Sequence, residues 1–309
     1  MGVHNADQGL VPSDPAGEVT GLGAADLPTG PDHVSFGQRV AWASRAYGRL
    51  CVGLDPSAAT LAVWDLADTP DGVERFCNRL IEAATGLCGL IKPQAAFFER
   101  HGAAGVAVLE RVLLAGRQAG LITILDVKRG DIGSTMDGYA AAFLADGAPL
   151  AADAITLSPY LGFGSLRGAI DLALSSHRGV FVLAMTSNPE GVQVQGALGP
   201  DGLTVGQTVL AQVGQVNAGL AGPGSVGVVV GSTIGVLPPA TAELLAQLGG
   251  PILAPGLGAQ GATVADLRAC FGQSYGRVIA PVSRGITKAG PNLAALRARL
   301  EDWQSQLLG

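Results

Sequence analysis

Two carboxylates and an ammonium group stand close together at the end of an apolar run, in the sequence LITILDVKRGDIGST (121–135). Side chains alternate between the two faces of a strand, so we expect Asp126 and Lys128 to point the same way. Buried parallel strands carry chemistry at their C-terminal ends, where Asp131 would also lie. The spacing therefore predicts a prepared site, and the alternative is a surface ion-pair cluster that contributes little.

Lysine is used sparingly in this chain, and two of the lysines come at the ends of predicted strands. Of the 19 lysines and arginines, only Lys92, Lys128 and Lys288 are lysines. Arginine stays protonated in proteins, whereas lysine can release a proton. Unless this placement is chance, Lys92 and Lys128 occupy positions that need an ammonium group, one of them with a transferable proton.

The composition favours a protein with a large core. Hydrophobic residues make up 48% of the 309 residues and charged residues 14%, as expected when both faces of a sheet are covered. The net charge of −6 and the lack of a basic run argue against nonspecific nucleic-acid binding. No apolar stretch has the length of a membrane span, and the N-terminus does not resemble a signal peptide.

Cysteine and histidine spacings indicate neither disulfides nor a metal site. The cysteines are Cys51, Cys77, Cys88 and Cys270, and the histidines are His4, His33, His101 and His177. No C-x-x-C pair is present, and Cys51 and Cys88 fall inside predicted strands, so we expect reduced core thiols in a cytoplasmic protein. The histidines lack the spacing of metal ligands, so we expect no structural metal.

The sequence predicts one domain of alternating strands and helices over residues 34–309, preceded by a flexible extension over residues 1–33 that is rich in Gly, Pro and Asp. Predicted strands cover 50–54, 87–91, 121–125, 154–157, 180–184, 226–230, 252–254 and 278–280. Predicted helices cover 72–85, 103–119, 135–145, 165–175, 203–220, 239–248, 263–270 and 293–307. Eight strands each followed by a helix predict an α/β fold, a closed (β/α)8 TIM barrel. The alternative is a doubly wound open sheet, although no G-x-G-x-x-G follows the first strand.

Polar residues fall where the active face of such a barrel would be. Asp55 follows the first strand, Lys92 the second, the group from Asp126 to Asp131 the third, and Ser158 the fourth. Residues 186–199, after the fifth strand, form a long loop with glycines and glutamines that could act as a lid.

Glycine-rich segments follow the last two predicted strands, which is the usual place of a phosphate site in this fold. The segments are PGLGAQG (255–261), which contains Pro255, Gly256 and Gly258, and PVSRGIT (281–287), which contains Arg284 and Gly285. Glycines let backbone N–H groups approach a phosphate, and an arginine adds a bidentate clamp. The alternative is ordinary turn glycine beside a surface arginine.

The motif DVKRGDIGST resembles the signature of the orotidine 5′-phosphate decarboxylases, specifically their longer bacterial (type 2) subgroup. Further matching segments are CVGLDPS (51–57), IKPQAAFFE (91–99), ITLSPYLG (155–162), MTSNP (185–189), LAPGLGAQG (253–261) and PVSRGI (281–286). The resemblance begins near residue 34 and runs to the C-terminus. It implies decarboxylation of orotidine 5′-monophosphate to uridine 5′-monophosphate and carbon dioxide, in de novo pyrimidine synthesis, without a metal or an organic cofactor.

The resemblance also implies roles for the charged residues. Lys128 is expected to donate the proton to the ring carbon that loses carbon dioxide. Asp126 and Asp131 are expected to flank it, and Lys92 to complete an alternating charge network. Asp131 and Thr135 are expected to reach the active site of the second subunit of a homodimer.

Substrate binding is implied for a second set of residues. Asp55 and Lys92 are expected to bind ribose hydroxyls, Ser158 and Gln260 the pyrimidine, and Arg284 with the glycine-rich loops the phosphate.

Two other readings remain open at this point. One is a metal-dependent sugar-phosphate decarboxylase or aldolase on the same barrel. Resemblance to such enzymes implies an acidic residue near the end of the second strand that helps to hold magnesium, and Lys92 occupies that place here. The other is a noncatalytic phosphosugar-binding barrel, which would need the phosphate loops but not the charged network.

Overall fold

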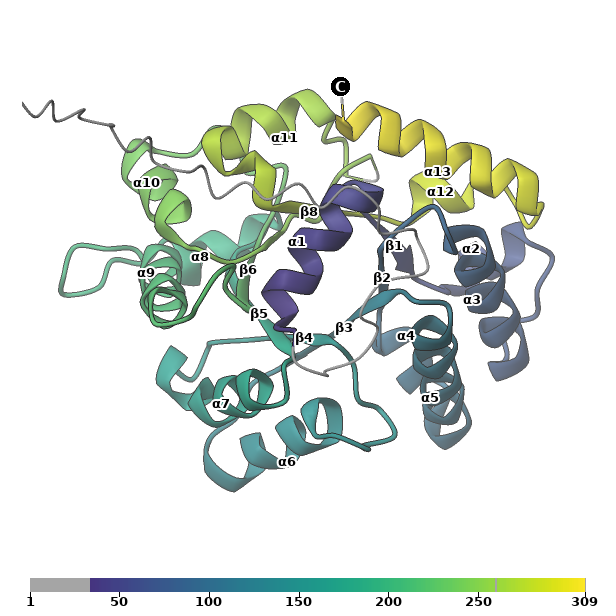
Figure 1. Ribbon diagram of the computed structural model, residues 1–309, viewed down its shortest axis with the longest axis horizontal. Helices are drawn as coiled ribbons and strands as arrows, with labels where there is room; N and C mark the ends of the chain where they lie inside the picture. Colours follow the sequence, from purple (N-terminus) through teal and green to yellow (C-terminus); the bar gives the residue numbers. More distant parts are fainter. Residues whose placement is uncertain (1–33, 259, 309) are drawn as a thin grey trace, which may run out of the picture.

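The computed structural model describes residues 34–258 and 260–308, and in these residues eight parallel strands close into a barrel (Figure 1). The strands are β1 (Leu50–Leu54), β2 (Leu90–Pro93), β3 (Ile122–Arg129), β4 (Ala154–Leu157), β5 (Gly179–Met185), β6 (Val226–Val230), β7 (Ile252–Leu253) and β8 (Val278–Val282). Each strand pairs with its neighbours in the sequence, and β8 pairs with β1. The predicted (β/α)8 barrel is confirmed, and the open sheet is excluded.

Helices surround the barrel on the outside (Figure 1). Eight of them follow the eight strands in turn: α3 (Pro70–Ala84), α5 (Gly102–Gln118), α6 (Gly133–Leu144), α7 (Arg167–Ser175), α9 (Val205–Ala218), α10 (Pro239–Gln247), α11 (Val264–Phe271) and α13 (Leu293–Leu308). These correspond to the eight predicted helices. Five further helices in the described residues were not predicted, namely α1 (Phe36–Tyr47), α2 (Ala58–Val63), α4 (Ala96–Glu99), α8 (Val192–Gln195) and α12 (Arg284–Thr287). Single 3-10 turns include η2 (Phe163–Leu166) and η4 (Gly272–Arg277).

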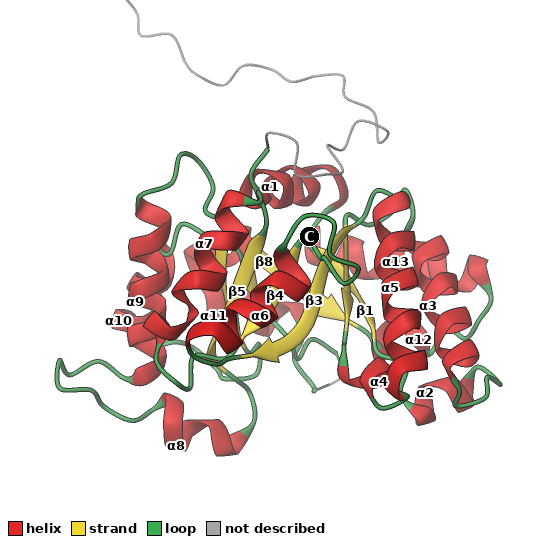
Figure 2. Cartoon of the chain, turned by 90° about the horizontal axis from the view of Figure 1, so that it is seen from below, coloured by secondary structure: helices red, strands yellow, loops and turns green. Residues whose placement is uncertain are grey.

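Helix α1 closes the N-terminal end of the barrel and lies across the end opposite to α2 and α4 (Figure 2). It begins with a capping box in which Ser35 and Gln38 satisfy each other's backbone amides. Phe36 packs edge-on against Phe181 of β5, with 5.9 Å between ring centroids. A Cβ on Gly179 would lie 2.2 Å from the Phe36 ring, so only glycine fits there. With this end filled by side chains, the opposite end is left for a site.

Two predicted strand boundaries were wrong by three residues or more. β2 begins at Leu90 rather than Leu87, because the amides of Leu87 and Cys88 donate to the carbonyl of Ala84 and so complete the end of α3. Cys88 therefore precedes β2, whereas Lys92 lies within it. β3 continues to residue 129, so Asp126 and Lys128 are parts of the strand.

The segment 186–199, predicted as a loop, contains the 3-10 turn η3 (Pro189–Gly191) and the short helix α8 (Val192–Gln195), which lies towards the same end of the barrel as α2 and α4 (Figure 2). The cysteines are all free and buried. Among the described helices, none is both long and apolar enough to span a membrane. The predicted extension, residues 1–33, lies outside the described residues.

Candidate active site

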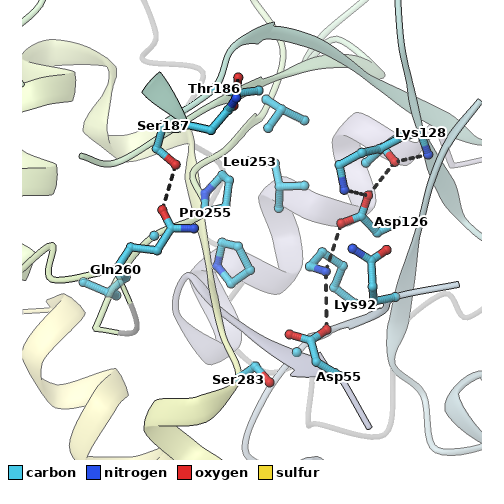
Figure 3. A pocket seen from close by; sticks show the side chains of 18 of the residues that line it. Asp55, Lys92, Asp126, Lys128, Thr186, Ser187, Leu253, Pro255, Gln260 and Ser283 are labelled. Atoms are coloured by element: carbon cyan, nitrogen blue, oxygen red, sulfur yellow. Dashed lines mark hydrogen bonds and ion pairs between the residues drawn. The ribbon is translucent and has the colours of Figure 1, made fainter. Parts of the chain in front are cut away.

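A cavity of about 370 Å³ opens at the C-terminal ends of the strands, on the side away from α1 (Figure 3). Eight of the residues predicted from the sequence line it: Asp55, Lys92, Asp126, Lys128, Pro255, Gly256, Gln260 and Arg284. Cavity residues that the sequence analysis missed include Gly53, Gln94, Thr156, Thr186, Ser187, Asn188 and Ser283. The barrel therefore brings residues from β1, β2, β3, β7 and β8 to one place.

Lys92 lies at the centre of the charged residues, between two carboxylates (Figure 3). Its Nζ is 3.2 Å from Asp126 Oδ2 and 3.8 Å from Asp55 Oδ1, and its side chain is 9% exposed. Burial lowers the pKa of this ammonium, but the charges of Asp126 and Asp55 outweigh burial and raise its pKa above the ordinary value. Lys92 is therefore a fixed positive charge at the floor of the cavity.

Lys128 also contacts the Asp126 carboxylate, and it does so from an irregular part of the β3 backbone. Its backbone has φ +46°, which is rare for a residue with a side chain. Residues 126–128 form a bulge, because Leu125 pairs with Ile155 and the next paired residue, Arg129, pairs with Leu157. Lys128 Nζ donates to Asp126 Oδ1 over 2.7 Å, and its side chain is 46% exposed. The two side chains do meet, as predicted, but through a bulge rather than regular alternation.

Asp126 contacts both lysines of the site. Its Oδ2 faces Lys92, and its Oδ1 accepts hydrogen bonds from Lys128 Nζ and from the hydroxyl of Thr156. Burial raises the pKa of this carboxyl, but the charges of both lysines and the two hydrogen bonds to Oδ1 hold it well below its usual range. Asp126 is therefore ionised at neutral pH and keeps both ammonium groups in place.

Asp55 offers an unused acceptor. Its Oδ1 is buried, and no described residue donates a hydrogen bond to it within 3.5 Å. A buried carboxylate oxygen without a donor is costly unless a ligand or water supplies one. Asp55 lines the cavity beside Lys92 and its side chain is 30% exposed, so its other carboxylate oxygen could accept a hydrogen bond from a ligand hydroxyl (Figure 3).

The opposite wall of the cavity carries neutral polar groups. Ser187 Oγ donates to Gln260 Oε1 over 2.7 Å, which joins the loops after β5 and β7 (Figure 3). Gly256 has φ +118°, and a Cβ there would lie 2.5 Å from Ser232 Oγ, so this turn requires glycine. Arg284 is exposed at the start of α12, on the rim of the cavity.

A family model described as "Orotidine 5'-phosphate decarboxylase / HUMPS family" matches residues 48–299. The chain belongs to this family.

Relatives of similar length share about half of the sequence. The orotidine 5'-phosphate decarboxylase of Salinispora arenicola is 50% identical over 279 residues, which cover 89% of this chain and 99% of that protein. The corresponding protein of Streptomyces coelicolor is 52% identical over 262 residues, covering 85% and 93%.

Solved structures agree with the fold. A crystal structure from Streptomyces avermitilis has a TM-score of 0.84 and 48% identity, covering 89% of this chain and 95% of that one. The Leishmania donovani OMP decarboxylase has a TM-score of 0.70 and 32% identity, covering 89% and 98%.

Five of the predicted site residues lie outside the cavity of this chain. The resemblance to the orotidine 5′-phosphate decarboxylase family had assigned them to the site, and they are Asp131, Thr135, Ser158, Gly258 and Gly285. Asp131 Oδ1 accepts a hydrogen bond from the backbone amide of the next residue, Ile132, and Thr135 is exposed on α6. β4 ends at Leu157, one residue before Ser158, whose amide donates to the carbonyl of Arg129.

The two glycines serve packing in this structure. A Cβ on Gly258 or Gly285 would lie 3.1 or 2.9 Å from the ring of Trp303 in α13. Both glycines therefore allow the last helix to approach the loops after β7 and β8. Phosphate binding was predicted for both glycines because a Gly-rich sequence does not reveal which side of the backbone is crowded.

Missed residues had weak signals. Gln94 is two residues beyond Lys92 and Thr156 is two residues before Ser158, so alternation could have suggested both. Among the described residues, no group of three or more His, Cys, Asp or Glu side chains is placed to hold a metal.

Proposed function

We propose that this chain decarboxylates orotidine 5′-monophosphate to uridine 5′-monophosphate and carbon dioxide, with Lys128 as the proton donor. The observation that carries the proposal is the array Lys92–Asp126–Lys128, which lies at the floor of a cavity whose rim holds Arg284. The substrate and reaction come from the relatives named for this activity, which are half identical over nearly their whole length.

The array supplies what this decarboxylation requires. When the bond from the ring carbon to the carboxylate breaks, its electron pair stays on the ring carbon, and carbon dioxide leaves. A positioned ammonium stabilises that developing negative charge and then quenches it by proton transfer. In this account Lys128 Nζ gives its proton to the ring carbon and recovers one from solvent after product release. Asp126, paired with both lysines, keeps Lys128 oriented.

The remaining cavity residues suit a nucleotide. The Asp55 carboxylate, which lines the cavity beside Lys92, is suited to the ribose hydroxyls. Arg284 and the turn at Gly256 are suited to the phosphate, since a guanidinium binds it bidentately and glycine admits close approach. Gln260 would leave Ser187 to meet the pyrimidine, and Ser158 would approach when the loop after β4 shifts.

We propose further that the active enzyme is a homodimer in which Asp131 and Thr135 serve the partner's site. Their place outside the cavity of their own chain is compatible with that role. The exposed apolar side chains Ile132, Tyr160 and Leu161, which are 62%, 78% and 52% exposed, lie on the neighbouring loops after β3 and β4. Burial of these side chains against a second copy would cover them.

The metal-dependent alternative is less compatible with the site. Lys92 is a buried positive charge at the cavity floor and would repel a divalent cation. We infer that no metal takes part. The buried free thiols fit a reducing compartment, and we infer that the enzyme works in the cytoplasm.

An absorbance assay with orotidine 5′-monophosphate tests the proposal. The purified chain should consume this substrate at a rate proportional to enzyme concentration, with uridine 5′-monophosphate as the product. A sugar phosphate without a pyrimidine ring, tested under the same conditions with magnesium present, should not react. Turnover of the sugar phosphate but not of the nucleotide would refute the proposal.

A further inference from the structure

Thr156 joins the backbone of Lys128 to the carboxylate that holds its side chain. The hydroxyl of Thr156 donates a hydrogen bond to Asp126 Oδ1 over 2.8 Å and accepts one from the backbone amide of Lys128 over 2.9 Å. Lys128 Nζ donates to the same Oδ1 over 2.7 Å. The three residues therefore form a closed ring of hydrogen bonds that runs from the Lys128 amide to its own ammonium.

The bulge in β3 explains why a side chain is needed here. Opposite Thr156, three residues of β3 stand where regular pairing would have one, so the Lys128 amide meets no carbonyl of β4. A partly buried amide without an acceptor is costly, and the hydroxyl of Thr156 replaces the missing carbonyl. Thr156 is only 1% exposed, so water does not compete for these bonds.

The same contact holds Lys128 in an unfavourable backbone conformation. A φ of +46° is disfavoured for a residue with a Cβ and persists only where neighbouring contacts enforce it. Without the Thr156 hydroxyl, Lys128 could relax towards regular strand geometry, and its ammonium would move away from its present position in the cavity lining. A small displacement of a proton donor has a large effect on rate.

We propose that Thr156 is a positioning residue, whose hydroxyl sets the backbone of Lys128 and the orientation of Asp126 so that the ammonium points at the reacting carbon. The catalytic part of this inference rests on the proposed function, because it takes Lys128 as the proton donor. Thr156 itself takes no part in proton transfer, since its hydroxyl hydrogen is engaged in the hydrogen bond to Asp126.

The test compares three substitutions. Thr156→Val keeps the shape but removes the hydroxyl, and Thr156→Ser keeps the hydroxyl but removes the methyl group. The matched control is Thr123→Val, near the start of β3. Thr123 is also buried, donates a hydrogen bond to a carboxylate (Asp153 Oδ2, 2.9 Å) and accepts one from a backbone amide (Asp153 N, 3.2 Å).

We expect Thr156→Val to lower kcat by roughly 10–100-fold, the worth of one hydrogen bond to a charged group, with KM changed less than about threefold. Thr156→Ser should retain kcat within about threefold of wild type. Thr123→Val should lose a similar amount of thermal stability to Thr156→Val but keep kcat within about twofold. Equal losses of kcat in the two valine variants would overturn the inference, because a general loss of stability would then explain both.

A second readout does not depend on activity. Since the chain has only three lysines, labelling with [15N]lysine gives three backbone amide signals, which Lys→Arg variants assign. The Lys128 signal should shift in Thr156→Val and its hydrogen exchange should quicken at least about tenfold, while the Lys92 and Lys288 signals stay unchanged. An unchanged Lys128 signal would refute the positioning role of Thr156 even if the wild type turned over substrate. A wild type without turnover would instead refute the proposed function, and the Lys128 signal would still test whether Thr156 positions the Lys128 backbone.

Discussion

Replacing Asp126 by asparagine removes one negative charge from between two ammonium groups while keeping the shape of the side chain. Lys92 Nζ lies 3.2 Å from Asp126 Oδ2, and both side chains are 9% exposed. Removing one partner of a buried pair typically costs about 3–5 kcal/mol. Asp55, at 3.8 Å, remains as a second partner of Lys92, so the lower end applies. The Lys128 contact adds little to stability, because that side chain is 46% exposed and solvent screens the pair.

We therefore expect Asp126→Asn to lower the free energy of unfolding by about 3 kcal/mol at neutral pH, or to lower Tm by roughly 6–12 °C in a domain of this size. Thermal unfolding followed by circular dichroism measures this. The matched control is Asp171→Asn, which breaks the exposed pair with Arg167 over 2.8 Å and should shift Tm by less than about 2 °C.

The pH dependence gives a second check on the same substitution. The pKa of Asp126 in the folded protein is depressed below its ordinary value of 3.8 by the lysine charges and hydrogen bonds that outweigh burial. A depressed folded pKa contributes stability that is complete above the unfolded value and is lost as pH falls towards the folded value. The difference between wild type and Asp126→Asn should therefore be constant near neutral pH and shrink below about pH 4. A difference equal to that of the control, or one without this pH dependence, would refute the reasoning.

Three further outcomes are expected. Inactive Lys128→Ala and Asp131→Ala variants, mixed so that subunits exchange, should regain about a quarter of wild-type activity, because half of the dimers are mixed and each has one intact site; confirmed exchange without rescue would mean that Asp131 serves its own chain. Excess chelator should leave turnover unchanged, since Lys92 occupies the place that a metal would need, and activity lost and then restored by magnesium would contradict this. Deletion of residues 1–33, which lack a periodic apolar pattern, should change Tm and turnover little; a Tm drop of many degrees would show that the segment stabilises the barrel.

The barrel could be predicted because its strands are short apolar runs that alternate regularly with helical segments. Helix α1 precedes the first strand, so the alternation of strands and helices did not predict it, although the Ser35–Gln38 capping pattern was present in the sequence. The start of β2 was misplaced because apolar residues such as Leu87 look alike whether they end a helix or begin a strand.

The charged residues of the site could also be predicted, because Asp126 and Lys128 interrupt an apolar strand. The bulge that brings them together could not, since positive φ at a lysine has no signal in the sequence. Thr156 was missed for a related reason: threonine is common in strands, and its role arises only from the bulge on the neighbouring strand.

The central claim is that Lys128 acts as the proton donor in decarboxylation of orotidine 5′-monophosphate. The most direct measurement is the steady-state turnover of Lys128→Arg beside that of Lys288→Arg, the same substitution at a lysine that does not line the cavity. Lys128→Arg keeps the charge but provides a larger and far poorer proton donor. We predict a loss of at least about 10²–10⁴-fold for Lys128→Arg and turnover within about twofold of wild type for Lys288→Arg. Turnover of Lys128→Arg within a few-fold of wild type would contradict the account.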